Sequence, residues 1–141
     1  MPTRTALLAV ACLLVPLVLA GCGKSQLPPE AVVRAWNDGV TTAQDDRAAK
    51  LFARDAVVLD GDQEQVLHDI PAAAAWNRSR PCAGLVRTLT THRDIVTVTL
   101  LLGDRAEGSC AARNGTSTME FEVRGNKIVF IRTLSSTPAP A

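Results

Sequence analysis

The sequence predicts a single α+β domain in which helices cover one face of an antiparallel sheet. Three segments with helical character come first, between residues 30 and 80, and four longer segments rich in β-branched residues follow. In one of these later segments Met119, Phe121 and Val123 alternate with polar residues, which is typical of a strand with one buried face. Helices and strands with one apolar face each bury those faces against one another.

The first helix is predicted to begin at Pro28-Pro29, because a proline costs little in the first turn of a helix. Its apolar positions recur at helical spacing on one face, at Ala31, Val32, Ala35, Trp36, Gly39 and Val40. A second helix is predicted from a cap at Thr42 to near Arg54, with Asp45 and Asp46 in its first turn, where the helix dipole favours acidic groups.

A short hairpin, a third helix and the sheet are predicted to follow. Residues 56–59 and 65–67 are the hairpin strands, and Asp69 is expected to cap the third helix. The sheet comprises residues 85–91, 95–102, 116–124 and 127–134. Residues 135–141 contain two prolines and no apolar periodicity, which predicts a disordered tail.

Residues 1–21 resemble a bacterial lipoprotein signal peptide. Arg4 precedes an apolar run, and Leu19-Ala20-Gly21-Cys22 places a cysteine where cleavage occurs. In signals of this kind the cysteine is lipidated and becomes the first residue of the mature chain. The resemblance therefore implies palmitate-type acylation on Cys22, a tether over residues 22–29, and a position on the extracytoplasmic face of the cell membrane.

Two other interpretations of this segment are a transmembrane helix and an ordinary secretory signal. A membrane-spanning helix needs about 20 apolar residues, whereas this run is shorter and contains Pro16. A secretory signal requires no cysteine at the cleavage site. Two or more acyl chains hold a protein durably at a membrane, whereas one chain is marginal.

The four cysteines divide between the leader and the domain. Cys12 leaves with the signal and Cys22 is lipidated, so Cys82 and Cys110 remain as an even pair in an exported protein. We expect these two to form a disulfide. A metal site or a redox role is the alternative, but the chain has no Cys-x-x-Cys motif and no histidine near either cysteine.

Charge and composition argue against a nucleic-acid partner. The chain has 15 basic and 14 acidic residues, and Arg4 leaves with the signal, so the mature chain is formally neutral. It has no tyrosine, three phenylalanines and two tryptophans, with no clustered basic segment. No cofactor or metal motif is present either.

The order of the elements resembles the nuclear transport factor 2-like superfamily, in particular its polyketide-cyclase-like (SnoaL-like) branch. The resemblance is carried by residues 51–58 at the exit of the second helix, His68-Asp69-Ile70 at the start of the third, and residues 124–131 in the final hairpin. It covers residues 30–134. It implies three helices packed in the concave face of a curved antiparallel sheet, the cystatin-like cone. In this superfamily the mouth of the cone often holds a small apolar ligand, and many members are homodimers.

Catalysis in this superfamily uses polar groups inside the cone, often a tyrosine beside a protonated carboxyl group. This chain has no tyrosine, so the phenol donor to a developing oxyanion is absent. A general base could still be supplied by Glu120, His68 or Asp60, with His92 and Glu122 as further acid/base side chains. Each also has a structural interpretation: Asp60 is a turn residue, His68 belongs to a helix start, and Glu120 lies on the outer sheet face unless the register is reversed.

Trp36 and Trp76 are the candidate pocket residues, since aromatic walls are common in small-molecule sites. They are equally suited to the core. The function favoured by the sequence is a membrane-anchored, non-catalytic domain that binds a small apolar ligand or a partner protein. An enzyme using general acid/base catalysis on a small apolar substrate is one alternative, and an interaction module whose cone is filled by its own side chains is another.

Overall fold

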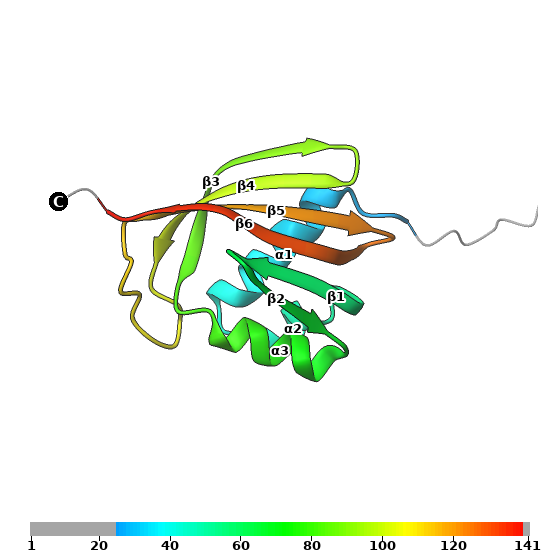
Figure 1. Ribbon diagram of the computed structural model, residues 1–141, viewed down its shortest axis with the longest axis horizontal. Coiled ribbons are helices and arrows are strands. Elements are labelled where there is room, and N and C mark those ends of the chain that lie inside the picture. The colour runs from blue at the N-terminus through cyan, green and yellow to red at the C-terminus, as the bar shows by residue number, and fades with distance from the viewer. Residues whose placement is uncertain (1–24, 140–141) are drawn as a thin grey trace, which may run out of the picture.

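The computed structural model describes residues 25–139, which form three helices and one six-stranded sheet (Figure 1). The predicted leader at residues 1–21 and Cys22 lie outside the described residues. The helices are α1 (Pro29–Thr41), α2 (Asp45–Ala49) and α3 (Ile70–Ser79). The strands are β1 (Phe52–Asp60), β2 (Gln63–Leu67), β3 (Ala83–His92), β4 (Ile95–Gly103), β5 (Thr116–Arg124) and β6 (Lys127–Thr137).

The strand order is β2-β1-β6-β5-β4-β3, and the curved sheet carries its helices on one face (Figure 1). The predicted α+β class, with helices on one face of a curved sheet, is thereby confirmed. The sheet was predicted to be antiparallel but is mixed, because β1 pairs with β6 in parallel while the other neighbours are antiparallel. After β2 the chain crosses through α3 to the far edge at β3. It then returns strand by strand, so β6 arrives beside β1 in the same direction.

The core lies between α1 and the inner face of the sheet. The predicted alternation in β5 is confirmed, since Met119, Phe121 and Val123 are buried while the residues between them are partly exposed. Trp36 packs against the ring of Phe121, with the ring centroids 5.0 Å apart. The predicted inner and outer faces of β5 are therefore those of the structure.

The second helix is much shorter than predicted. It ends at Ala49 rather than near Arg54, because the chain enters the sheet at Phe52, which pairs with Ile128 of β6. The amide of Ile128 donates a hydrogen bond of 2.8 Å to the carbonyl of Leu51. Sheet pairing with a strand some 75 residues away in sequence overrides the local helix propensity.

The helix termini and the C-terminus give one confirmation and two corrections. Asp69 caps α3 as predicted, accepting a 2.8 Å hydrogen bond from the amide of Ala72. Thr42 does not cap α2; its hydroxyl donates to the carbonyl of Asp38 at the end of α1. Residues 135–137, predicted as part of the tail, belong to β6 and pair with residues 116–118.

None of the helices within residues 25–139 has the length and hydrophobicity needed to cross a membrane.

Candidate functional site

The candidate site is a pocket of about 250 Å³ between the C-terminal half of α1 and the inner face of the sheet. Its walls are mostly apolar and come from α1, β4 and β5. Side chains that provide these walls are Trp36, Val40, Leu100, Leu102 and Met119. The polar groups around it are fewer and include Asn37, Asp60, Arg80 and Ser117.

Regular secondary structure places the apolar walls. Trp36 and Val40 are four residues apart on α1 and share one helix face, while Leu100 and Leu102 share one face of β4. Gly84 of β3 lets the backbone approach closely, since a Cβ at this position would lie 2.8 Å from the Cβ of Leu100. The pocket is therefore shaped by helix and strand periodicity and by one small residue.

Arg80 brings a positive charge into this largely apolar environment. It follows α3 directly, and its guanidinium carbon lies 5.0 Å from the centroid of the Trp76 ring. Its Nη1 atom lies 3.8 Å from Oδ2 of Asp60, and the side chain is 21% exposed. Burial lowers the pKa of Arg80; the carboxylate of Asp60 partly offsets this, and the charge of Arg105 lowers the pKa further.

A buried polar network next to the pocket joins α1, α2 and α3 to the loop after β4. The indole Nε1 of Trp36 donates to Oδ1 of Asn77 at 3.0 Å, and the Asn77 amide donates to the carbonyl of Asp45 at 3.0 Å. Arg105 donates to both carboxylate oxygens of Asp45 at 2.7 Å and to the carbonyls of Asn77 and Arg80. These contacts fix the backbone of Arg80 at the edge of the pocket.

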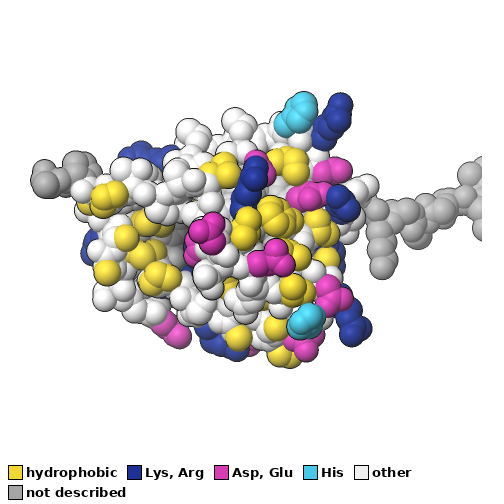
Figure 2. All heavy atoms as spheres, in the orientation of Figure 1, with side chains coloured by type: hydrophobic (Ala, Val, Ile, Leu, Met, Phe, Trp, Pro, Cys, Tyr) yellow, Lys and Arg dark blue, Asp and Glu magenta, His cyan; other side chains and the backbone are white. Residues whose placement is uncertain are grey.

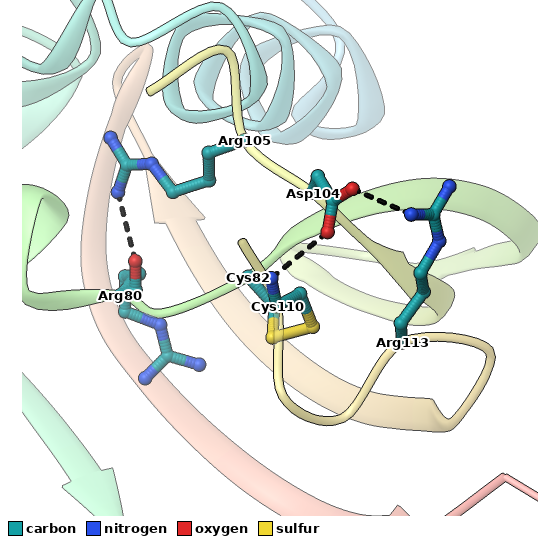
Figure 3. The surroundings of a disulfide bond; sticks show 6 residues. All are labelled: Arg80, Cys82, Asp104, Arg105, Cys110 and Arg113. Carbon is teal, nitrogen blue, oxygen red and sulfur yellow. Dashed lines mark hydrogen bonds and ion pairs between the residues drawn. A yellow bond between two sulfur atoms is a disulfide. The ribbon is translucent and has the colours of Figure 1, made fainter. Parts of the chain in front are cut away.

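The predicted disulfide between Cys82 and Cys110 is present (Figure 3). Cys82 lines the pocket, and its bond to Cys110 ties the loop after β4 to the start of β3. Asp104 strengthens the same loop, because its carboxylate accepts hydrogen bonds from the amide of Cys110 at 2.9 Å and from Arg113 at 2.8 Å. The disulfide thus supports one wall of the site.

The three candidate bases do not come together. Asp60 lies at the rim of the pocket, with its side chain 59% exposed. His68 is 73% exposed at the edge of a separate, open groove, where its Nδ1 lies 2.8 Å from a carboxylate oxygen of Asp55. Glu120 is on the outer sheet face and forms an ion pair of 2.9 Å with Arg132. Figure 2 shows acidic and basic side chains side by side on the surface turned to the viewer.

The two tryptophans stack on each other but have different positions. Their ring centroids are 6.0 Å apart, and Trp36 lines the pocket whereas Trp76 lies beneath Arg80. Sequence analysis missed Arg80, Asn77 and Arg105, because their roles depend on burial and on partners far along the chain. Within residues 25–139 no three His, Cys, Asp or Glu side chains group as metal ligands would.

No protein-family model and no curated protein matches this chain. Solved structures do resemble it. One is an NTF2-like protein of unknown function from Cytophaga hutchinsonii, with 8% identity and a TM-score of 0.63 over 79% of this chain and 92% of that one. Another is a putative polyketide cyclase from Sinorhizobium meliloti, with 22% identity and a TM-score of 0.58 over 76% of this chain and 94% of that one.

A third is a hypothetical protein from Catenulispora acidiphila with a ketosteroid isomerase-like fold, solved in complex with trimethylamine. It has 16% identity and a TM-score of 0.60, over 74% of this chain and 84% of that one. At these identities the likeness concerns the fold. The structure has helices on the inner face of a six-stranded curved sheet, and it is similar to the solved structures named above. We conclude that the chain has the NTF2-like, ketosteroid isomerase-like fold.

Proposed function

We propose that this protein is a lipid-anchored, extracytoplasmic binding protein whose domain holds a small, largely apolar ligand in the cone. The observation that carries the proposal is the pocket of about 250 Å³, with apolar walls and few polar groups at its edge. Small-molecule sites combine these two features, and their usual volume of roughly 300–1,000 Å³ suggests that the ligand here is small. The neighbour bound to trimethylamine is consistent with small-molecule binding by this fold.

Binding is favoured over catalysis by the positions of the candidate bases. Of the three, Asp60 lies at the pocket, on its exposed rim, whereas His68 and Glu120 lie elsewhere. The chain also has no tyrosine to stabilise a developing oxyanion. A ligand in this pocket would meet apolar walls and a guanidinium group.

The place where the chain enters the domain, just before α1, suggests how the domain is presented at the membrane. The amide of Leu27 donates a 2.7 Å hydrogen bond to Oδ1 of Asn126, so the chain enters the domain beside the β5–β6 turn. A lipid on Cys22 would be at most about 17 Å from Leu27 along an extended chain. The pocket is lined by Trp36, Asn37 and Val40 in the second half of α1, away from the end where the chain enters, so in our proposal the ligand enters from the aqueous side.

Native mass spectrometry tests the binding proposal. The mature chain, purified from the envelope of its own host, should carry a discrete mass above that of its acylated polypeptide. A Leu102→Trp variant, which fills the pocket, should lose this mass, whereas Leu134→Trp on the exposed part of β6 should keep it. An unmodified mass in the parent chain, or an adduct that Leu102→Trp retains, would contradict binding in the cone.

The anchor has its own test, which does not depend on the ligand. A Cys22→Ala chain should lose both labelling by a palmitate analogue and retention in the membrane fraction. Cys12→Ala is the matched control, because this cysteine leaves with the predicted signal. Membrane retention and acylation that survive Cys22→Ala would show that the anchor is assigned wrongly.

A further inference from the structure

Arg80 is a partly buried cation whose hydrogen-bonding capacity is largely unused. A guanidinium has five N–H donors, yet the shortest contact to its charged partner Asp60 is 3.8 Å, beyond hydrogen-bond distance. No hydrogen bond within residues 25–139 comes from this guanidinium, although one face covers the Trp76 ring. The Arg80 side chain is 21% exposed and lines the pocket, so a ligand there that accepts hydrogen bonds would meet N–H donors that have no partner among the described residues.

Arg105 shows how the same chain treats an arginine with a structural role. Its side chain is 6% exposed and makes four hydrogen bonds through its two terminal nitrogens, two of them to the carboxylate of Asp45 at 2.7 Å, although its Nε is buried without a partner in the described part of the chain. One of the other two fixes the carbonyl of Arg80 itself. The backbone of Arg80 is thus held by a hydrogen bond, while its side chain, which lines this pocket and a second, more polar one beside α2, makes none within residues 25–139.

We propose, building on the ligand-binding function above, that the pocket takes a small monocarboxylate with a short apolar tail. The carboxylate lies on the guanidinium of Arg80, and the tail lies against Leu100 and Met119. The planar fork of an arginine matches the two oxygens of a carboxylate. Asp60, whose side chain is 59% exposed on the rim, turns toward solvent when the ligand enters.

Two other head groups fit less well. A phosphate monoester carries close to two negative charges at neutral pH, and the second nearby cation, Arg105, is already paired with Asp45. An ammonium group would compete with Arg80 for Asp60 and would meet a like charge at the pocket. A single negative charge is therefore the best complement to this site.

The test compares three probes of equal chain length: hexanoate, hexanol and hexylamine. The mature acylated chain is reconstituted in phosphatidylcholine vesicles, and binding is followed by tryptophan fluorescence, since both tryptophans of the chain belong to the aromatic cluster at the site. Hexanoate should bind about tenfold or more tightly than hexanol, the usual scale of one charge-assisted hydrogen-bonding pair. Hexylamine should bind most weakly.

Arg80→Gln should abolish the preference for hexanoate over hexanol. Arg78→Gln is the matched control, because Arg78 is an exposed arginine on α3 that pairs with Asp46 away from this pocket. Asp60→Asn, a substitution of an exposed residue that should leave folding intact, should tighten hexanoate binding because it removes the competing carboxylate.

The outcomes separate this inference from the binding function on which it rests. Hexanol or hexylamine binding as tightly as hexanoate, or a preference that survives Arg80→Gln, would overturn the carboxylate assignment and leave a binding pocket. An adduct of the purified chain that contains no carboxyl group would do the same. If no probe binds and the purified chain carries no adduct, both proposals fail.

Discussion

Replacing Asp45 with asparagine should destabilise the domain strongly, because it leaves a buried positive charge without its partner. Asp45 and Arg105 are 9% and 6% exposed at their side chains, and both carboxylate oxygens lie 2.7 Å from Nη2 of Arg105. The pair joins α2 to the loop that carries Cys110. Asparagine has nearly the same shape as aspartate, so the substitution removes the charge with little change in packing.

The expected size of the effect follows from this geometry. Unit charges about 4 Å apart attract by about 4 kcal/mol at an effective dielectric constant of about 20. Removing one partner of a buried pair costs about 3–5 kcal/mol in measured cases. We therefore expect Asp45→Asn to lower the free energy of unfolding by about 3–5 kcal/mol, a large share of the roughly 5–15 kcal/mol available to a domain.

Urea unfolding of the mature chain, followed by tryptophan fluorescence, measures this loss. Asp46→Asn is the matched control, because Asp46 is the next residue on α2 but is 84% exposed and pairs with Arg78 at 3.2 Å. Exposed ion pairs contribute about 0–1 kcal/mol. If the two variants lose stability equally, with unchanged urea dependence, the buried pair does not have the role that we assign to it.

Two further substitutions test how the pocket is built. Gly84→Ala should cost about 1–3 kcal/mol of unfolding free energy by overpacking, because its Cβ would lie 2.7–2.8 Å from atoms of the Leu100 side chain. Gly103→Ala, whose Cβ meets nothing within 4 Å, should change stability by less than about 0.5 kcal/mol. If urea unfolding shows the same loss of free energy for both variants, the close approach of Gly84 to Leu100 does not limit the packing. Serine at both Cys82 and Cys110 should cost about 3–4 kcal/mol, since the bond closes a loop with a separation of 28 residues. We expect the double variant and the parent treated with reductant to have the same unfolding temperature. That temperature should lie well below the unfolding temperature of the oxidised parent.

Local sequence signals predicted the elements whose stability is local or periodic. The cap at Asp69 requires a hydrogen bond to an amide three residues away, and the alternation through Met119 and Phe121 reflects one buried face. Both signals lie within a few residues of sequence. Elements of this kind could therefore be read without knowledge of the tertiary structure.

The departures from prediction come from partners far along the chain. Phe52 joins the sheet instead of the second helix because it pairs with Ile128, and the last residues of β6 are ordered by pairing with β5. Neither Phe52 nor the polar residues of the C-terminal segment carries a local signal for these partners. Such pairings require the strand order to be known first.

The site was predictable in its apolar part and not in its polar part. Helical periodicity placed Trp36 on the apolar face of the first helix, and the frequency of aromatic walls in small-molecule sites made it a pocket candidate; the structure has it among the lining residues. Arg80 follows the end of α3 and lines the pocket, and its carbonyl accepts a hydrogen bond from Arg105 in the loop after β4. A charged residue between two elements is usually a solvated one, and only the fold shows that this one is partly buried.

The buried ion pair and the proposed carboxylate site are linked through Arg105, which yields a joint prediction. Arg105 is held by Asp45 and in turn donates to the carbonyl of Arg80, so loss of the Asp45 charge should displace Arg105 and release that carbonyl. Under conditions where Asp45→Asn is still folded, its preference for hexanoate over hexanol should therefore fall at least severalfold, with hexanol affinity retained. Asp46→Asn should keep the full preference. An unchanged preference in folded Asp45→Asn would mean that α3 alone positions Arg80 and that the network contributes stability without orienting the site.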